Sequence, residues 1–207
     1  MTGRSFIIPL FLLYVSVMLV ITFLQQEFAL LPALQNLDIV SEDMKVEIIE
    51  RWQRMRWLSF LLVPILLALR ISLVTLCLFI GGFFVTEMSG KKYKDWGGVA
   101  TIAQAVMLTY SIIICIVNLA FGSNMATEVT EHISLLFLGG ENTEPWVRMP
   151  LAAVNVFEIL YWIVMALCVG KLCGTKFWRS FKFVMSSYGV GYLFYVALLM
   201  FLLLYLS

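Results

Sequence analysis

The sequence predicts an all-α, polytopic integral membrane protein. The chain of 207 residues is 62% hydrophobic and 13% charged, whereas soluble domains are about 45–50% apolar and about 25% charged. The apolar residues gather in five blocks, each near or above the about 20 residues that a helix needs to cross a bilayer. The blocks are Phe6–Leu24, Leu58–Phe84, Val99–Phe121, Pro150–Leu172 and Phe183–Leu206. No soluble segment between them is long enough for a core, so any chemistry must lie in the bundle or its loops.

The first block, Phe6–Leu24, could be either a retained span or a cleaved signal peptide. Its charged start is the single residue Arg4, and its apolar run is long for a signal sequence. No cleavage site with small residues follows, because the chain continues Gln25-Gln26-Glu27-Phe28. These features favour a retained transmembrane helix.

A polar segment before the second block is predicted to be helical. Ser41 is a candidate N-cap, and apolar residues follow at helical spacing: Met44, Ile48, Trp52 and Met55. Two carboxylate–arginine pairs stand four residues apart: Glu47–Arg51 and Glu50–Arg54. The pattern predicts an interfacial helix that leads into the second span, with a helix that docks a partner as the alternative. Pro64 is expected to kink that span or to begin it.

This segment divides the chain into two parts. Residues 1–57 form an N-terminal transmembrane helix with an extracytoplasmic amphipathic helix. Residues 58–207 form a membrane domain of four helices in two hairpins. The hairpin turns resemble each other, as Gly90-Lys91-Lys92-Tyr93-Lys94-Asp95-Trp96 and Gly174-Thr175-Lys176-Phe177-Trp178-Arg179-Ser180-Phe181. The two hairpins are therefore interpreted as a parallel repeat about an axis along the membrane normal.

Loop charge predicts the orientation in the membrane. The connectors Val85–Gly98 and Gly170–Lys182 are rich in lysine and arginine, whereas Gln25–Trp57 and Gly122–Met149 carry most of the acids. Because basic loops stay in the cytoplasm, the N-terminus is predicted to be cytoplasmic and the C-terminus extracytoplasmic. The expected location is a bacterial cytoplasmic membrane. Three basic residues before the second span oppose this orientation: Arg51, Arg54 and Arg56.

Two charged residues lie inside the predicted spans. Arg70 falls within Leu61–Val85 and Glu158 within Pro150–Leu172, although a charge at the bilayer centre costs about 2.5–3.5 kcal/mol. If the hairpins are equivalent, the two residues differ in depth by roughly 6 Å, at about 1.5 Å per residue. This spacing favours an ion pair that locks two helices together. Alternatively, Glu158 and Asn155 line a polar cavity for a proton, an ion or a headgroup, or the charges reach opposite interfaces.

A second cluster of polar residues lies in the fourth connector. Glu128, Glu131 and the single histidine His132 would share one face of a helix, and the spacing resembles a zinc motif whose first histidine has become glutamate. Zinc peptidase sites normally use two histidines, so the cluster is interpreted as part of a polar, amphipathic helix. Its expected apolar side is Ile133, Leu135, Leu136 and Phe137.

Other features of the sequence do not indicate a catalytic or cofactor site. The four cysteines form no C-x-x-C pair and are expected to pack as small apolar residues. Gly189 and Gly191 lie inside the last span, where they favour close helix packing. Ser186, Ser187 and Tyr188 are candidates for hydrogen bonds across the bundle. No catalytic residue, cofactor or metal site is predicted, and a net charge of +1 argues against nucleic acid as a partner.

The order of these elements resembles the Yip1-domain family, and most closely its short bacterial-type members with five spans. Two stretches carry the resemblance: Leu78–Phe84 through Gly90–Trp96, and Asn155–Trp162 through Gly174–Phe177. The resemblance covers about residue 56 to the end and implies the fold. Family members that act in trafficking use a long cytoplasmic N-terminal region, whereas only Met1–Ser5 precede the first span here, so that role is not carried over.

The expected function is that of a non-catalytic accessory or structural subunit of a larger membrane complex, in export, secretion or membrane organisation. Its partners would be the lipid bilayer and either another protein or a second copy of the chain. The alternative is a small permease or proton- or ion-coupled carrier that uses Glu158, Arg70 and Asn155. A third class, an intramembrane enzyme, would depend on the cluster from Glu128 to His132 alone.

Overall fold

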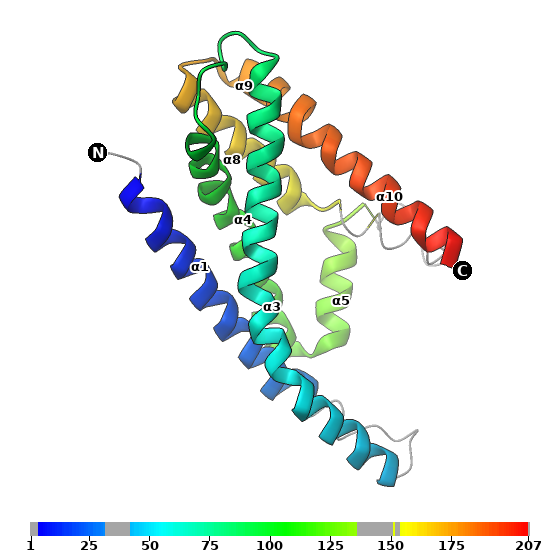
Figure 1. Ribbon diagram of the computed structural model, residues 1–207. Helices are drawn as coiled ribbons and strands as arrows, with labels where there is room; N and C mark the ends of the chain where they lie inside the picture. The colour runs from blue at the N-terminus through cyan, green and yellow to red at the C-terminus, as the bar shows by residue number, and fades with distance from the viewer. Residues whose placement is uncertain (1–3, 32–41, 136–150, 152–153, 207) are drawn as a thin grey trace.

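The computed structural model describes residues 4–31, 42–135, 151 and 154–206, and these residues fold as a bundle of helices (Figure 1). The elements are α1 (Arg4–Gln25), the π-helix η1 (Gln26–Leu30), α3 (Glu42–Phe83), α4 (Tyr93–Phe121), α5 (Ser123–His132), α8 (Val156–Cys173), α9 (Phe177–Val184), the π-helix η2 (Met185–Gly189) and α10 (Val190–Leu206). Five helical segments of the described chain are long and apolar enough to cross a membrane. The all-α class is therefore confirmed for the described residues, and the five helices have the length and apolar character of membrane spans.

Helix α3 is one continuous helix of 42 residues. At about 1.5 Å per residue it is about 63 Å long, roughly twice the hydrocarbon thickness of a bilayer. The predicted interfacial helix and the second span therefore belong to one helix, and the depth at which α3 enters the membrane stays a prediction. Pro64 lies inside the helix, where its ring removes one backbone hydrogen bond, and Figure 1 shows that α3 changes direction part-way along its length. The predicted cap Ser41 lies outside the described residues.

The paired charges of the polar segment are arranged as predicted. Arg51 and Glu47 form an ion pair of 3.1 Å, and Arg54 and Glu50 one of 3.8 Å. Arg56 reaches across to Glu27 in η1 at 2.6 Å. The arginines that opposed the predicted orientation thus each have a carboxylate beside them.

Other helices also begin or end at different residues from the predicted apolar blocks. Helix α8 begins at Val156, because Asn155 has an extended backbone and caps the helix, and the predicted start at Pro150 lies outside the described residues. The third and fifth spans begin earlier than expected, at Tyr93 and Phe177. The helix of the fourth connector, α5, ends at His132, so Ile133 and Leu135 do not form its apolar side. Instead, the segment 133–135 pairs with 154–156 through an isolated antiparallel bridge between Ser134 and Asn155.

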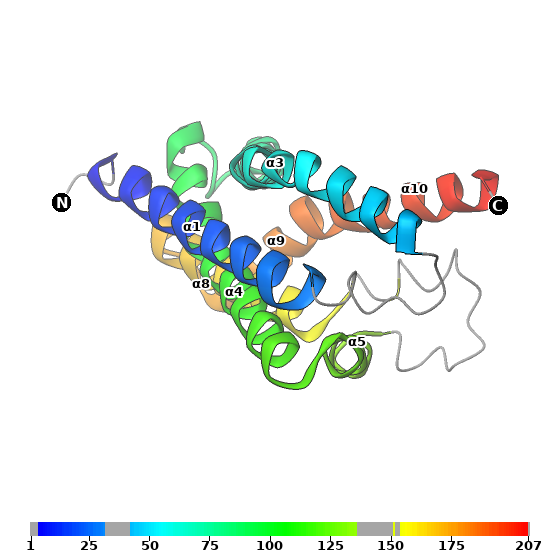
Figure 2. The same cartoon turned by 90° about the horizontal axis from the view of Figure 1, so that it is seen from below.

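Helix α4 lies at the centre of the bundle and packs against α1, α3 and α8. Figure 2, seen from below, shows α1, α4 and α8 on one side and α3 on the other. The core between them is built from buried apolar side chains: Val74, Leu78, Trp96, Ala100, Ala103, Tyr161, Met165, Val169 and Val184. Buried side chains of α3, α4, α8 and α9 therefore meet in one core.

Helix α3 approaches η2 unusually closely. A Cβ atom added to Gly81 would lie 2.5 Å from Cβ of Ser187, a distance that real atoms do not adopt. A Cβ atom added to Gly191 would lie 3.4 Å from Sγ of Cys77, which is an ordinary contact. Glycine at position 81 allows the close approach of α3 to η2, and the close packing predicted at Gly189 and Gly191 stays a prediction.

The two basic turns lie at the same end of the bundle, at the top of Figure 1. Arg179 in α9 forms an ion pair of 2.6 Å with Glu87 in the other turn. This contact joins the two turns directly. The repeat, and the side of the membrane on which this end lies, stay predictions.

Helix α10 leaves the bundle after its first turn. Figures 1 and 2 both show it diverging from α8 and α4 toward the C-terminus, and its main packing partner within the described chain is the preceding segment η2. Its large side chains are accordingly exposed: Val190, Leu193, Phe194, Tyr195, Leu198 and Phe201. The last span therefore presents an apolar surface on most of its circumference.

Candidate functional site

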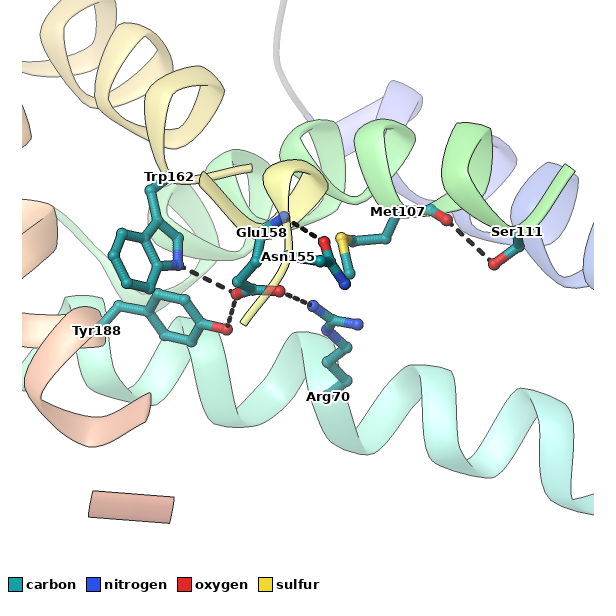
Figure 3. A network of polar contacts seen from close by, with 7 residues as sticks. All are labelled: Arg70, Met107, Ser111, Asn155, Glu158, Trp162 and Tyr188. Atoms are coloured by element: carbon teal, nitrogen blue, oxygen red, sulfur yellow. Dashed lines mark hydrogen bonds and ion pairs between the residues drawn. The ribbon is translucent and has the colours of Figure 1, made fainter. Parts of the chain in front are cut away.

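The two intramembrane charges meet in the middle of the bundle (Figure 3). Nη2 of Arg70, in α3, donates a hydrogen bond of 3.1 Å to Oε2 of Glu158, in α8. Glu158 is only 2% exposed. The structure thus contains the ion pair between the second and fourth spans that the sequence favoured.

The other carboxylate oxygen of Glu158 is also fully engaged. Its Oε1 accepts hydrogen bonds from Nε1 of Trp162 at 3.1 Å and from the hydroxyl of Tyr188 at 2.9 Å. Figure 3 shows the three donors converging on the carboxylate from different sides. Because a buried carboxylate is stable only when it is paired and hydrogen-bonded, this arrangement explains how the charge is accommodated. We call Arg70, Glu158, Trp162 and Tyr188 the Glu158 network.

The network joins three segments that are far apart in the sequence. Arg70 comes from α3, Glu158 and Trp162 stand one turn apart in α8, and Tyr188 comes from η2. A π-helix adds one residue to a turn and shifts the following side chains around the axis. Tyr188 lies in this π-helical turn, directly before α10 begins. The network therefore fixes the segment from which α10 departs.

Asn155 has a different role from the one predicted. It stands before the first turn of α8, and its Oδ1 accepts a hydrogen bond of 2.9 Å from the backbone N–H of Glu158. Asn155 was predicted to line a polar cavity with Glu158, and in the structure it is the N-cap of α8. A cap of this kind contributes about 1 kcal/mol to helix stability. It also fixes the backbone that carries Glu158.

Arg70 is the only charged member of the network that reaches outward. Its guanidinium lies 5.3 Å from the ring centre of the buried Tyr161, in the range of a cation–π contact. Its side chain is 35% exposed, against 3% for that of Glu158. The exposed part borders a groove of about 580 Å³ between α3 and α10, which is lined mainly by leucine and tyrosine side chains.

The second predicted cluster is not assembled into a metal site. His132 donates from Nδ1 to the backbone carbonyl of Glu128 at 2.8 Å, which is a contact within helix α5. Among the described residues, no three histidine, cysteine or acidic side chains are close enough to hold a metal ion. The structure therefore offers, in the part of the chain that it describes, no set of metal ligands for the hypothesis of an intramembrane enzyme. Leu136 and Phe137 lie outside the described residues.

Sequence reasoning identified Arg70 and Glu158 but missed Trp162 as a donor. The signal was present, because residues four apart in a helix face each other and Trp162 follows Glu158 by four. Tyr188 was expected to bond across the bundle, and it does so. Ser186 and Ser187 instead donate to the backbone carbonyl of Phe183 in their own helix.

Comparison of the chain with models of protein families, with curated proteins and with solved structures gives no match. The resemblance to the Yip1-domain family therefore has no support from a family match. Any functional conclusion must come from the geometry of the bundle.

Proposed function

We propose that this chain is a non-catalytic integral membrane subunit that supports a larger membrane complex. In this proposal the Glu158 network is a structural lock that joins α3, α8 and η2. The hydrogen bonds of the carboxylate support a lock, because both oxygens of Glu158 already accept from side chains of the protein. The proposed location is the bacterial cytoplasmic membrane with the N-terminus in the cytoplasm, in line with the basic turns at one end.

The observation that carries the proposal is the position of α10. The lock holds Tyr188, and α10 leaves the bundle two residues later with its large apolar side chains exposed. A helix with so few neighbours in its own chain offers a long surface to another transmembrane helix. Such helices associate in lipid through close van der Waals packing. We therefore propose that α10 is the segment that contacts a partner subunit or a second copy.

A photo-crosslinking experiment tests this proposal. A photoreactive amino acid is placed at Phe194 on α10, and, as the matched control, at Ile116 on α4, which are 71% and 59% exposed. We expect a discrete protein adduct from position 194 in intact membranes, and only diffuse lipid labelling from position 116. Equal labelling at both positions, or no protein adduct at either, would contradict the proposal.

One observation favours a second function, the carrier. The groove beside Arg70 and Glu158 has a volume of about 580 Å³ and reaches the exposed part of the Arg70 side chain. Intramembrane ionisable residues commonly mark ion or proton pathways. Against this, a proton carrier would need Glu158 to exchange its partners during each cycle.

Proton flux distinguishes the carrier from the lock. Vesicles that contain a trapped pH-sensitive dye and the purified protein are given a potassium gradient with valinomycin. A carrier would acidify or alkalise the interior several times faster with the wild-type chain than with Glu158→Gln. We expect equal rates, at the level of protein-free vesicles. A faster rate that the substitution abolishes would favour the carrier over the lock.

A further inference from the structure

A basic hollow opens at the end of the bundle where the two turns meet. It has a volume of about 740 Å³ and lies between the α8–α9 turn and the turn that follows α3. Its lining includes three basic side chains and one acidic one: Lys176, Arg179, Lys182 and Glu87. Nothing in the lock or in the proposed contact of α10 uses this hollow.

The charges in the hollow do not cancel. Glu87 is paired with Arg179 at 2.6 Å, so one acid neutralises one base. Lys176 and Lys182 are exposed, and neither forms an ion pair with any residue that the structure describes. Two positive charges therefore remain on one side of the same cavity. Such an arrangement favours an anion.

Aromatic side chains beside the hollow favour a position at the membrane interface. Trp178 lines the hollow and is 69% exposed, while its neighbour Phe177 is 37% exposed. Exposed tryptophan at the end of a transmembrane helix is typical of the headgroup region. The buried side of the same helix is Ser180, Phe183 and Val184. This pattern favours a position of Lys182 in α9, and of the N-cap residue Lys176, at the level of lipid headgroups.

We infer that the hollow binds the headgroup phosphate of an anionic phospholipid, whose acyl chains lie along the exposed aromatic side chains. Charge complementarity comes from Lys176 and Lys182, and Arg179, which is paired with Glu87, also lines the hollow. Basic pockets between transmembrane helices are known to accept anionic headgroups. A soluble phosphate would gain the charge contacts but not the contact with Trp178. The lipid is therefore the occupant that both features favour.

Native mass spectrometry of the full chain in a mild detergent tests the inference. The protein is titrated with phosphatidylglycerol and, separately, with zwitterionic phosphatidylcholine. The double variant Lys176→Gln/Lys182→Gln is expected to bind phosphatidylglycerol about 30-fold more weakly, because each lysine near anionic headgroups contributes about fivefold. Binding of phosphatidylcholine is expected to stay unchanged. Both side chains are exposed, so the fold is expected to persist, and thermal unfolding checks this.

A charge-matched control separates the hollow from general surface charge. Lys92→Gln/Lys94→Gln removes two exposed lysines at the same end of the bundle, and neither lines the hollow. We expect its affinity for phosphatidylglycerol to fall less than threefold. An equal loss in both double variants would overturn the inference. So would displacement of the lipid by inorganic phosphate at equal concentration, because the hollow would then be a site for a free anion.

Discussion

Replacement of Glu158 by leucine is expected to lower the free energy of unfolding by about 3 kcal/mol. Removal of one partner from a buried ion pair typically costs about 3–5 kcal/mol. The lower end applies here, since the Arg70 side chain is 35% exposed and can turn toward the interface. The substitution also leaves the donors of Trp162 and Tyr188 without their acceptor. Equilibrium unfolding in mixed detergent micelles measures the change.

The matched control for Glu158 is a carboxylate that makes no such contacts. Glu128 in α5 is exposed, and Glu128→Gln is expected to change stability by less than about 0.5 kcal/mol. The loss of stability for Glu158→Gln should lie between the losses for Glu128→Gln and Glu158→Leu, because the amide carbonyl oxygen can still accept hydrogen bonds from Trp162 and Tyr188. A loss of less than about 1 kcal/mol for Glu158→Leu would mean that the network does not lock the bundle.

A double-mutant cycle across Arg70 and Glu158 is expected to show strong coupling. Arg70→Met alone leaves a buried carboxylate with only neutral donors, and Glu158→Gln alone leaves a guanidinium without its counter-ion. The double variant removes both charges, so it should be less destabilised than the sum of the single changes by about 1–3 kcal/mol. If the single effects simply add, Arg70 and Glu158 do not act as a unit.

The chain contains an ion pair that serves as the control for this cycle. Arg51 and Glu47 also lie 3.1 Å apart, but their side chains are 71% and 66% exposed. A cycle of Arg51→Met and Glu47→Gln should give a coupling of only about 0.3–0.5 kcal/mol, as for exposed pairs one helical turn apart. Since the residue types and the distance match, the difference between the two couplings measures the contribution of burial.

The pattern of hydropathy along the sequence was sufficient to predict five apolar segments and to single out Arg70 and Glu158 within them. Hydropathy is a sum over neighbouring residues, and a charged residue inside such an apolar span is costly enough to stand out. The loop charges likewise grouped the two basic turns, which the structure brings together through Arg179 and Glu87. These inferences needed no knowledge of which helix packs against which.

The boundaries of the helices could not be obtained in the same way. The polar segment before Pro64 was predicted as an interfacial helix that leads into the second span, and in the structure both belong to the single helix α3. Proline is tolerated inside a transmembrane helix because neighbouring groups satisfy the freed carbonyl. The start of α8 depended on the cap at Asn155, which competes with a longer apolar pattern. Both outcomes are set by backbone hydrogen bonds that hydropathy does not count.

The sequence was thus enough to predict five apolar helices of membrane-spanning length and a charge pair that must be explained, because transfer to lipid is a local property of each segment. The partners of Glu158, the close approach of Gly81 to Ser187 and the departure of α10 from the bundle followed only from the folded chain. Each of these depends on contacts between segments far apart in sequence. Tyr188 reaches Glu158 because a π-helical turn rotates it into the bundle, and the same turn sets the point from which α10 leaves.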